Sequence, residues 1–149
     1  MLTKAPTSEA PAAEASPSGI TILVAEDDVI VRTLIASVLR AEGYRALLSA
    51  DGAQAIELFD RHADEISIVV LDVIMPRKSG REVAEYVWNL KPQMPILFTS
   101  GYFTDGMDPA KLPPAPDQAQ ILRKPYGRQE LIDRLRQIVS SQGAPPSVA

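Results

Sequence analysis

The sequence contains no cysteine, and only 5% of its residues are aromatic. The lack of cysteine excludes disulfide bonds and thiolate metal sites, and it fits a reducing compartment. No apolar run approaches the roughly 20 residues that a membrane-spanning helix needs. Residues 1–18 also lack the apolar central stretch of a secretory signal. We therefore expect a soluble, cytoplasmic protein that has no membrane partner.

Basic and acidic residues are nearly balanced: the sequence has 15 basic and 19 acidic residues and a net charge of −4. This balance gives no indication of a nucleic-acid partner. A chain of 149 residues, 46% of them hydrophobic, is large enough for one domain with its own core. Proline, alanine and serine crowd both ends, which predicts disordered tails at 1–18 and 142–149 around a domain at 19–141.

Between these tails the hydrophobic pattern alternates between strand and helix. Apolar runs predict buried strands at Ile20–Ala25, Arg45–Ser49, Ile66–Asp72, 95–100 and about 119–123. Apolar residues at helical spacing follow most of these runs. Gly43 provides a left-handed stop for the first helix, and Ser79 and Glu82 form a reciprocal capping pattern for the third. Val83, Val87 and Leu90 are predicted to form the inner face of that third helix. The alternation predicts an α/β fold, a doubly wound five-stranded parallel sheet with helices on both faces.

The connection between the fourth and fifth predicted strands breaks the alternation. It contains four prolines, and a proline in a helix interior costs about 3 kcal/mol or more. We therefore expect the fourth helix to be shortened or replaced by a proline-rich loop.

Polar side chains follow the predicted strands at the points where they end. Three acids follow the first strand, one acid ends the third, a threonine ends the fourth and a lysine follows the fifth: Glu26, Asp27, Asp28, Asp72, Thr99 and Lys124. In open α/β sheets the ligand site lies beyond the carboxyl ends of the strands, so these groups should meet there. Clustered carboxylates repel one another, and a hard divalent cation such as Mg2+, which prefers oxygen ligands, removes that cost. Histidine and cysteine, which favour zinc or copper, are absent from this set.

A carboxylate, a lysine, a hydroxyl and Mg2+ together suit phosphoryl transfer. A carboxylate can accept the phosphoryl group, and positive charge stabilises the oxygens of that group in flight. Two other classes remain open. One is an Mg2+-dependent phosphatase with Asp72 as nucleophile, although such enzymes commonly carry an acid two residues later, where this chain has Ile74. The other is a scaffold that is never phosphorylated.

Four segments in the expected order carry a specific resemblance: Asp27-Asp28, "VVLDVIMP", "PILFTSG" and "LRKPY". With them the chain resembles the receiver domain of two-component response regulators from about Ile20 to Ser141. The resemblance implies a flavodoxin-like sheet of order 2-1-3-4-5. It also implies a signalling switch that is not an enzyme for other substrates, and we expect it to lack its own output domain and to act on an unknown downstream protein.

The resemblance assigns a role to each group. Asp72 would accept a phosphoryl group from a histidine kinase or a histidine phosphotransfer protein, Lys124 would contact that group, and Thr99 would move toward it. The ligands of Mg2+ would be three carboxylates and one backbone carbonyl: Asp27, Asp28, Asp72 and Ile74. We interpret Glu26 as a solvated neighbour of this set.

One residue departs from the family pattern in the fifth strand. Receivers usually carry an aromatic residue three positions before the lysine, and this chain has Ile121 there. Tyr102 and Tyr126 flank the site, and either is a candidate to replace the missing aromatic residue. The oligomeric state is left open by the sequence.

Overall fold

The computed structural model describes residues 19–75, 77–100 and 119–143. Its elements follow the predicted alternation: β1 (Thr21–Ala25), α1 (Val29–Ala41), β2 (Arg45–Ser49), α2 (Gly52–His62), β3 (Ile66–Asp72), α3 (Gly80–Leu90), β4 (Ile96–Ser100), β5 (Ala119–Arg123) and α4 (Arg128–Gly143). The last helix thus runs two residues past the predicted end of the domain. Tyr102 and the proline-rich segment lie outside the described residues.

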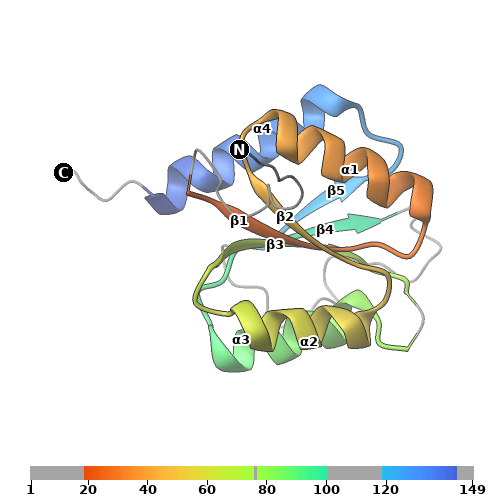
Figure 1. The fold of residues 1–149 in the computed structure, drawn as a ribbon, viewed down its shortest axis with the longest axis vertical. Helices are drawn as coiled ribbons and strands as arrows, with labels where there is room; N and C mark the ends of the chain where they lie inside the picture. Colours follow the sequence, from red (N-terminus) through yellow and green to blue (C-terminus); the bar gives the residue numbers. More distant parts are fainter. Residues whose placement is uncertain (1–18, 76, 101–118, 144–149) are drawn as a thin grey trace, which may run out of the picture.

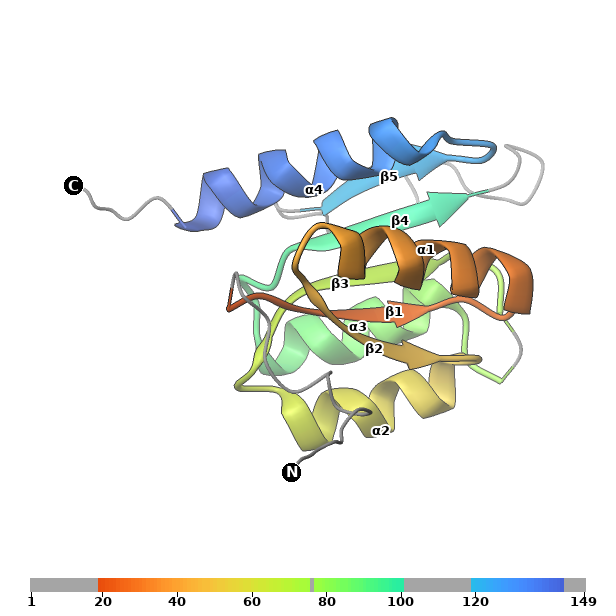
Figure 2. The ribbon, with the colours of Figure 1, turned by 45° about the horizontal axis from the view of Figure 1, so that its top comes forward.

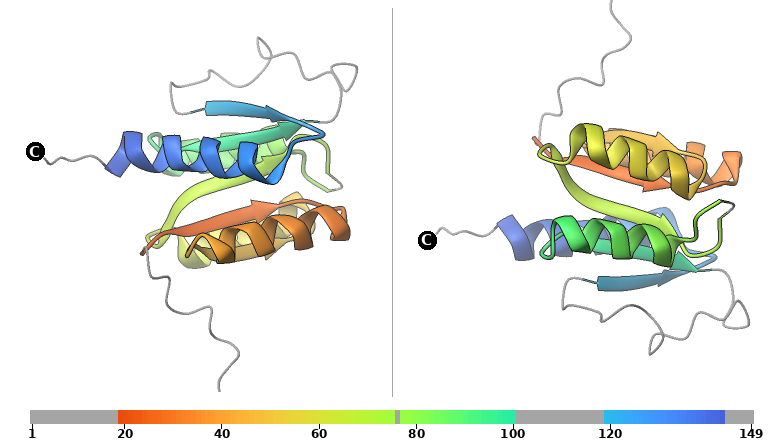
Figure 3. Two further views of the ribbon diagram at one scale, coloured as in Figure 1. Left: turned by 90° about the horizontal axis from the view of Figure 1, so that it is seen from above. Right: turned by 90° about the horizontal axis from the view of Figure 1, so that it is seen from below.

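The five strands form one sheet in the order β2-β1-β3-β4-β5, and every neighbouring pair is parallel. This confirms the predicted fold class and strand order. Helices α1 and α4 cover one face of the sheet and α2 and α3 cover the other (Figures 1, 2 and 3). Because all strands run the same way, their carboxyl ends share one edge, where the polar residues were expected to meet.

Strand β1 shows why the sheet needs a helical layer on each face. All five of its residues are buried, and side chains alternate between faces along a strand. Ile22 and Val24 belong to the apolar cluster under α1 and α4. Leu23 and Ala25 belong to the cluster under α2 and α3. A strand with no polar face therefore requires both layers.

The predicted helix signals are present in the structure. The Ser79 hydroxyl accepts a hydrogen bond from the N–H of Glu82, whose carboxylate accepts one from the N–H of Ser79, so the capping box is confirmed. Gly43 has φ of 86° just after α1, as the predicted stop requires. Leu90 was wrongly placed on the inner face. It is 57% exposed because it is the last residue of α3, past the buried Val87.

The capping box predicts a measurable loss of stability. Ser79→Ala removes the side-chain acceptor of the Glu82 N–H, and loss of such a cap costs about 1 kcal/mol. Urea unfolding should show this decrease. Ser37→Ala, an exposed change inside α1, is the control and should leave stability unchanged or slightly raised, because alanine has the higher helix propensity. Equal values for both variants would contradict the capping role.

Within the described ranges, none of the helices has the length and apolarity that crossing a bilayer requires.

Candidate functional site

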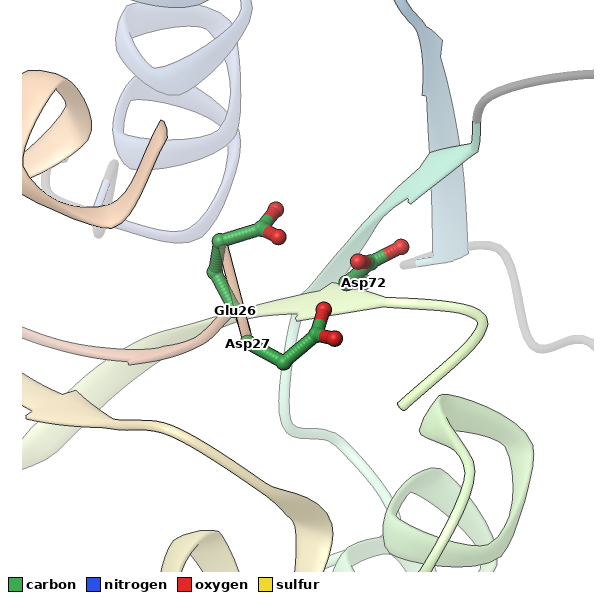
Figure 4. Close-up of side chains that lie close together, drawn as sticks. All are labelled: Glu26, Asp27 and Asp72. Carbon is green, nitrogen blue, oxygen red and sulfur yellow. The ribbon is translucent and has the colours of Figure 1, made fainter. Parts of the chain in front are cut away.

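Three carboxylates meet where β1 and β3 end. Glu26 and Asp27 directly follow β1, and Asp72 is the last residue of β3, the strand that pairs with β1. One carboxylate oxygen from each residue lies within 4.8 Å of the other two. Figure 4 shows the three side chains turned toward a common space at the ends of the two strands.

Lys124 brings a positive charge to this acidic group. It follows β5, and its Nζ lies 3.1 Å from Glu26 Oε1 and 3.4 Å from Asp72 Oδ2. Glu26 is 1% exposed and Asp72 is 6% exposed, whereas Asp27 is exposed. One ammonium group is therefore shared by two buried carboxylates, and the acidic group has an open side at Asp27.

The environment of Asp72 makes its charged form unfavourable. Burial raises the pKa of Asp72 to about 7; the negative charge of Glu26 adds to the rise, and Lys124 opposes it. For Lys124, burial alone would lower the pKa, but the charges and hydrogen bonds of Asp72 and Glu26 raise it. Lys124 thus remains a cation, and a further positive charge would help to ionise Asp72.

Glu26 is not the solvated neighbour that we expected. The backbone N–H of Glu26 donates to the carbonyl of Ser49 on β2, and the Arg32 guanidinium donates to the backbone carbonyl of Glu26 at 2.8 Å. Its Oε2 accepts a hydrogen bond from the N–H of Asp28. The backbone continues the strand geometry by one residue, which directs the Glu26 side chain into the fold and toward Lys124.

Asp28 has a different place from the one that the sequence reading gave it. It is exposed and is the N-cap of α1, where its Oδ1 accepts hydrogen bonds from the N–H groups of Ile30 and Val31. Among the described residues, the acidic group contains Glu26 and Asp27 with Asp72, and Asp28 is not part of it. An aspartate directly before an apolar helix is a capping signal that could have identified this role.

The remaining predicted site residues surround Asp72. Thr99 is 1% exposed and lies opposite Asp72 in the β3–β4 pairing, and its carbonyl accepts a hydrogen bond from the N–H of Val73. Ile74 lies in the loop after β3, and the metal role of its carbonyl stays a prediction.

Gly80, at the start of α3, packs so closely that a Cβ there would overlap the Asp72 carbonyl oxygen. Only glycine fits this contact.

The residue at the switch position and the described candidate to replace its missing aromatic ring lie on opposite faces of the sheet. Ile121 packs against the apolar cluster under α2 and α3. Tyr126 packs against the cluster under α1 and α4. The Tyr126 ring therefore does not fill the space that an aromatic residue at position 121 would use.

The acidic group fits Mg2+ by its chemistry. All three ligand atoms are carboxylate oxygens, which hard divalent cations prefer. Ligands at about 2.1 Å from such an ion are about 4.2 Å apart at most, so a separation within 4.8 Å needs little adjustment. Asp27, on the open side, leaves room for the water ligands that Mg2+ keeps.

A family model of the response regulator receiver domain matches residues 22–136. The chain belongs to this family. Its matched segment contains the acidic group, Thr99 and Lys124. As a receiver domain, it is related to proteins of two-component signalling.

Individual relatives cover the domain but differ in length. The response regulator receiver protein CpdR of Brucella abortus (strain 2308) is 28% identical over 118 residues, 79% of this chain and 95% of that protein. The sensor kinase CckA of the same organism is 30% identical over 122 residues, 82% of this chain but 13% of the kinase. YbdJ of Bacillus subtilis (strain 168), an uncharacterized transcriptional regulatory protein, is 29% identical and matched over 51% of its length. The chain therefore spans only part of several relatives.

Solved structures agree with this assignment. The crystal structure of a response regulator receiver protein from Sinorhizobium medicae WSM419 has a TM-score of 0.73 at 31% identity, covering 82% of this chain and 95% of that one. The receiver domain of the hybrid histidine kinase CckA has a TM-score of 0.68 at 28% identity, covering 80% and 98%.

Proposed function

We propose that this receiver domain is a phosphorylation switch in which Asp72 accepts a phosphoryl group from a histidine kinase or a histidine phosphotransfer protein. The observation that carries the proposal is the shared ammonium group: Lys124 Nζ lies within 3.4 Å of Asp72 and within 3.1 Å of Glu26. A buried carboxylate beside a cation and two further carboxylates combines an acceptor oxygen, positive charge and oxygen ligands for Mg2+.

In the proposed step a carboxylate oxygen of Asp72 attacks the phosphorus atom of a phosphohistidine. A P–O bond to Asp72 forms while the P–N bond of the donor breaks, and the electron pair stays on the imidazole nitrogen, which then takes up a proton. The Lys124 ammonium, already placed at Asp72 Oδ2, offsets the negative charge of the phosphoryl oxygens. Asp72 must be ionised to attack, and its raised pKa opposes this.

Glu26, Asp27 and Asp72 are the residues that we propose to hold Mg2+, with Glu26 in place of Asp28. When bound there, Mg2+ supplies positive charge that favours the ionised form of Asp72 and neutralises the phosphoryl oxygens. The exposed Asp27 carboxylate would be the ligand most accessible from solvent, whereas the Glu26 carboxylate is held by a hydrogen bond from the N–H of Asp28.

The signal would leave the site through Thr99. This buried residue lies opposite Asp72 on β4, so its hydroxyl can turn toward a new phosphoryl group while its backbone holds Val73. Such a shift would change the surface after β4 and the contacts made there with a downstream protein. Similarity along 95% of CpdR, a response regulator receiver protein, supports a receiver that acts through contacts with other proteins.

The first test is chemical labelling of the wild-type protein. Incubation with Mg2+ and acetyl phosphate, a small phosphodonor, should add one phosphoryl group per chain, detected by mass spectrometry. Because the product is an acyl phosphate, hydroxylamine should remove it. Omission of Mg2+ should reduce the labelling strongly, since the carboxylates then repel the donor. A protein that gains no hydroxylamine-sensitive phosphoryl group would be a non-phosphorylated scaffold, contrary to the proposal.

A further inference from the structure

The Tyr126 hydroxyl is a buried polar group that the proposed chemistry leaves unexplained. Its oxygen is shielded from solvent and has no hydrogen-bond partner among the described residues. The ring packs in the apolar cluster under α1 and α4, which holds it in place. Buried hydroxyl groups nearly always have partners, so an unpaired one next to a functional site calls for an explanation.

The position of Tyr126 connects it with Glu26. Tyr126 follows Lys124 by two residues in the chain. On β1, Ile22 and Val24 face the cluster that contains the Tyr126 ring, and Glu26 continues that alternation. Burial raises the pKa of the Tyr126 hydroxyl, and the negative charges of Glu26 and Asp72 raise it further. The hydroxyl therefore stays protonated and lies in the electrostatic field of both carboxylates, and no described residue accepts its hydrogen.

Phosphorylation would leave Glu26 in need of a donor. In the free protein Glu26 is 1% exposed, and its two oxygens are held by Lys124 and by the N–H of Asp28. A phosphoryl group brings a charge of about −1.5 to −2 to Asp72. Lys124, which already contacts Asp72, is drawn toward that charge and away from Glu26 Oε1. Even with Mg2+ bound to the acidic group, the buried Oε1 atom would then lack its hydrogen-bond donor, which is unfavourable unless another donor replaces the ammonium.

We propose that Tyr126 is a positioning residue whose hydroxyl donates a hydrogen bond to the Glu26 carboxylate when Lys124 turns to the phosphoryl group on Asp72. This inference rests on the proposed function, because it requires a phosphoryl group at Asp72. In the free protein the hydroxyl has no hydrogen-bond partner within the described part of the chain, and in the phosphorylated protein it replaces the Lys124 ammonium at Glu26. Tyr126 thereby favours the phosphorylated state over the free state without touching the phosphoryl group.

Beryllium fluoride with Mg2+ tests this idea at equilibrium, because it binds carboxylates as a stable analogue of a phosphoryl group. Tyr126→Phe removes only the hydroxyl. We expect it to weaken binding of the analogue about tenfold, the effect of losing one hydrogen bond to a charged group. Stability of the free protein, measured by urea unfolding without Mg2+, should be unchanged or raised, since the hydroxyl makes no hydrogen bond with the residues that the structure describes.

Tyr86→Phe is the matched control. Its hydroxyl donates to Asp60 at 2.6 Å between α3 and α2, away from the acidic group. Loss of that hydroxyl should lower stability with and without the analogue and leave analogue affinity unchanged. The two phenylalanine variants are therefore expected to show opposite patterns: Tyr126→Phe lowers analogue affinity without lowering stability, and Tyr86→Phe lowers stability without changing analogue affinity.

A spectroscopic measurement reports the new hydrogen bond directly. In protein labelled with 13C at tyrosine Cζ, the Tyr126 resonance, assigned by its loss in Tyr126→Phe, should shift when beryllium fluoride and Mg2+ saturate the site. The Tyr86 resonance should not. An unmoved Tyr126 resonance, or equal analogue affinity in wild type and Tyr126→Phe, would overturn the role of Tyr126 while the proposed function stands. Wild-type protein that binds no analogue and takes up no phosphoryl group would contradict the proposed function itself.

Discussion

Replacing Asp72 with asparagine is expected to abolish phosphoryl labelling and, in metal-free buffer at about pH 8, to make the protein more stable. Labelling is lost because an amide has no anionic oxygen to attack phosphorus. Stability rises because the substitution removes a buried charge that Glu26 repels. Lys124 keeps its contact with Glu26 at 3.1 Å, so the change leaves no unpaired cation behind.

The pH dependence of this effect follows from the raised pKa of Asp72. The unfolded carboxyl group has a pKa of about 3.9. In the folded state the pKa is about 7. Between these values the folded protein binds more protons than the unfolded chain, so the contribution of Asp72 to stability is greatest below about pH 4 and is lost as pH rises through about 7. A difference of one in pKa corresponds to about 1.4 kcal/mol, so the free energy lost over this pH range is roughly 2–4 kcal/mol.

Urea unfolding of wild type and Asp72→Asn, each with a metal chelator at about pH 5 and about pH 8, measures this prediction. The difference in unfolding free energy between the two proteins should increase with pH, and Mg2+ should reduce it by stabilising wild type alone. Asp64→Asn is the control, since Asp64 is fully exposed in a surface ion pair with Lys91. It should preserve labelling and show no such trend. A pH-independent difference for Asp72→Asn would mean that the folded protein does not raise the pKa of Asp72.

The fold could be predicted from the sequence because its signals are local. Strands β1 and β3 are short apolar runs, and the capping box at Ser79 is a pattern of four residues. Their parallel arrangement follows from the alternation with helices. The convergence of Asp72, Thr99 and Lys124 then follows from the rule that the carboxyl ends of parallel strands share one edge. The sequence therefore predicts where the site lies but not how its side chains are arranged.

The roles of three neighbouring acids could not be separated in the same way. Glu26, Asp27 and Asp28 have similar chemistry, and their roles depend on where the strand geometry stops and the helix begins. The hydrogen bond from the Glu26 N–H to the carbonyl of Ser49 extends the ladder by one residue, which buries Glu26 and leaves Asp28 to cap α1. Likewise, the burial of the Tyr126 hydroxyl depends on which face the loop after β5 packs against, and no local pattern specifies that face.

Paired substitutions at Asp27 and Asp28 test this assignment through Mg2+ affinity. Asp27→Asn removes one charged ligand from a group whose oxygens lie within 4.8 Å of one another, so affinity should fall at least about tenfold. Asp28→Asn removes the same charge one residue away. Asparagine caps helices as well as aspartate does, so α1 should keep its stability. Screening at physiological ionic strength should limit the effect on Mg2+ affinity to about twofold.

Isothermal titration calorimetry with Mg2+ at an ionic strength of about 0.15 M compares the two variants, and urea unfolding verifies that both remain folded. Since the substitutions are chemically identical, any difference between them comes from position alone. A larger loss of affinity in Asp28→Asn than in Asp27→Asn would restore Asp28 as the metal ligand. The N-cap of α1 could keep its contacts with Ile30 and Val31 in that case, because both hydrogen bonds end on Oδ1 of Asp28 and leave Oδ2 for the ion.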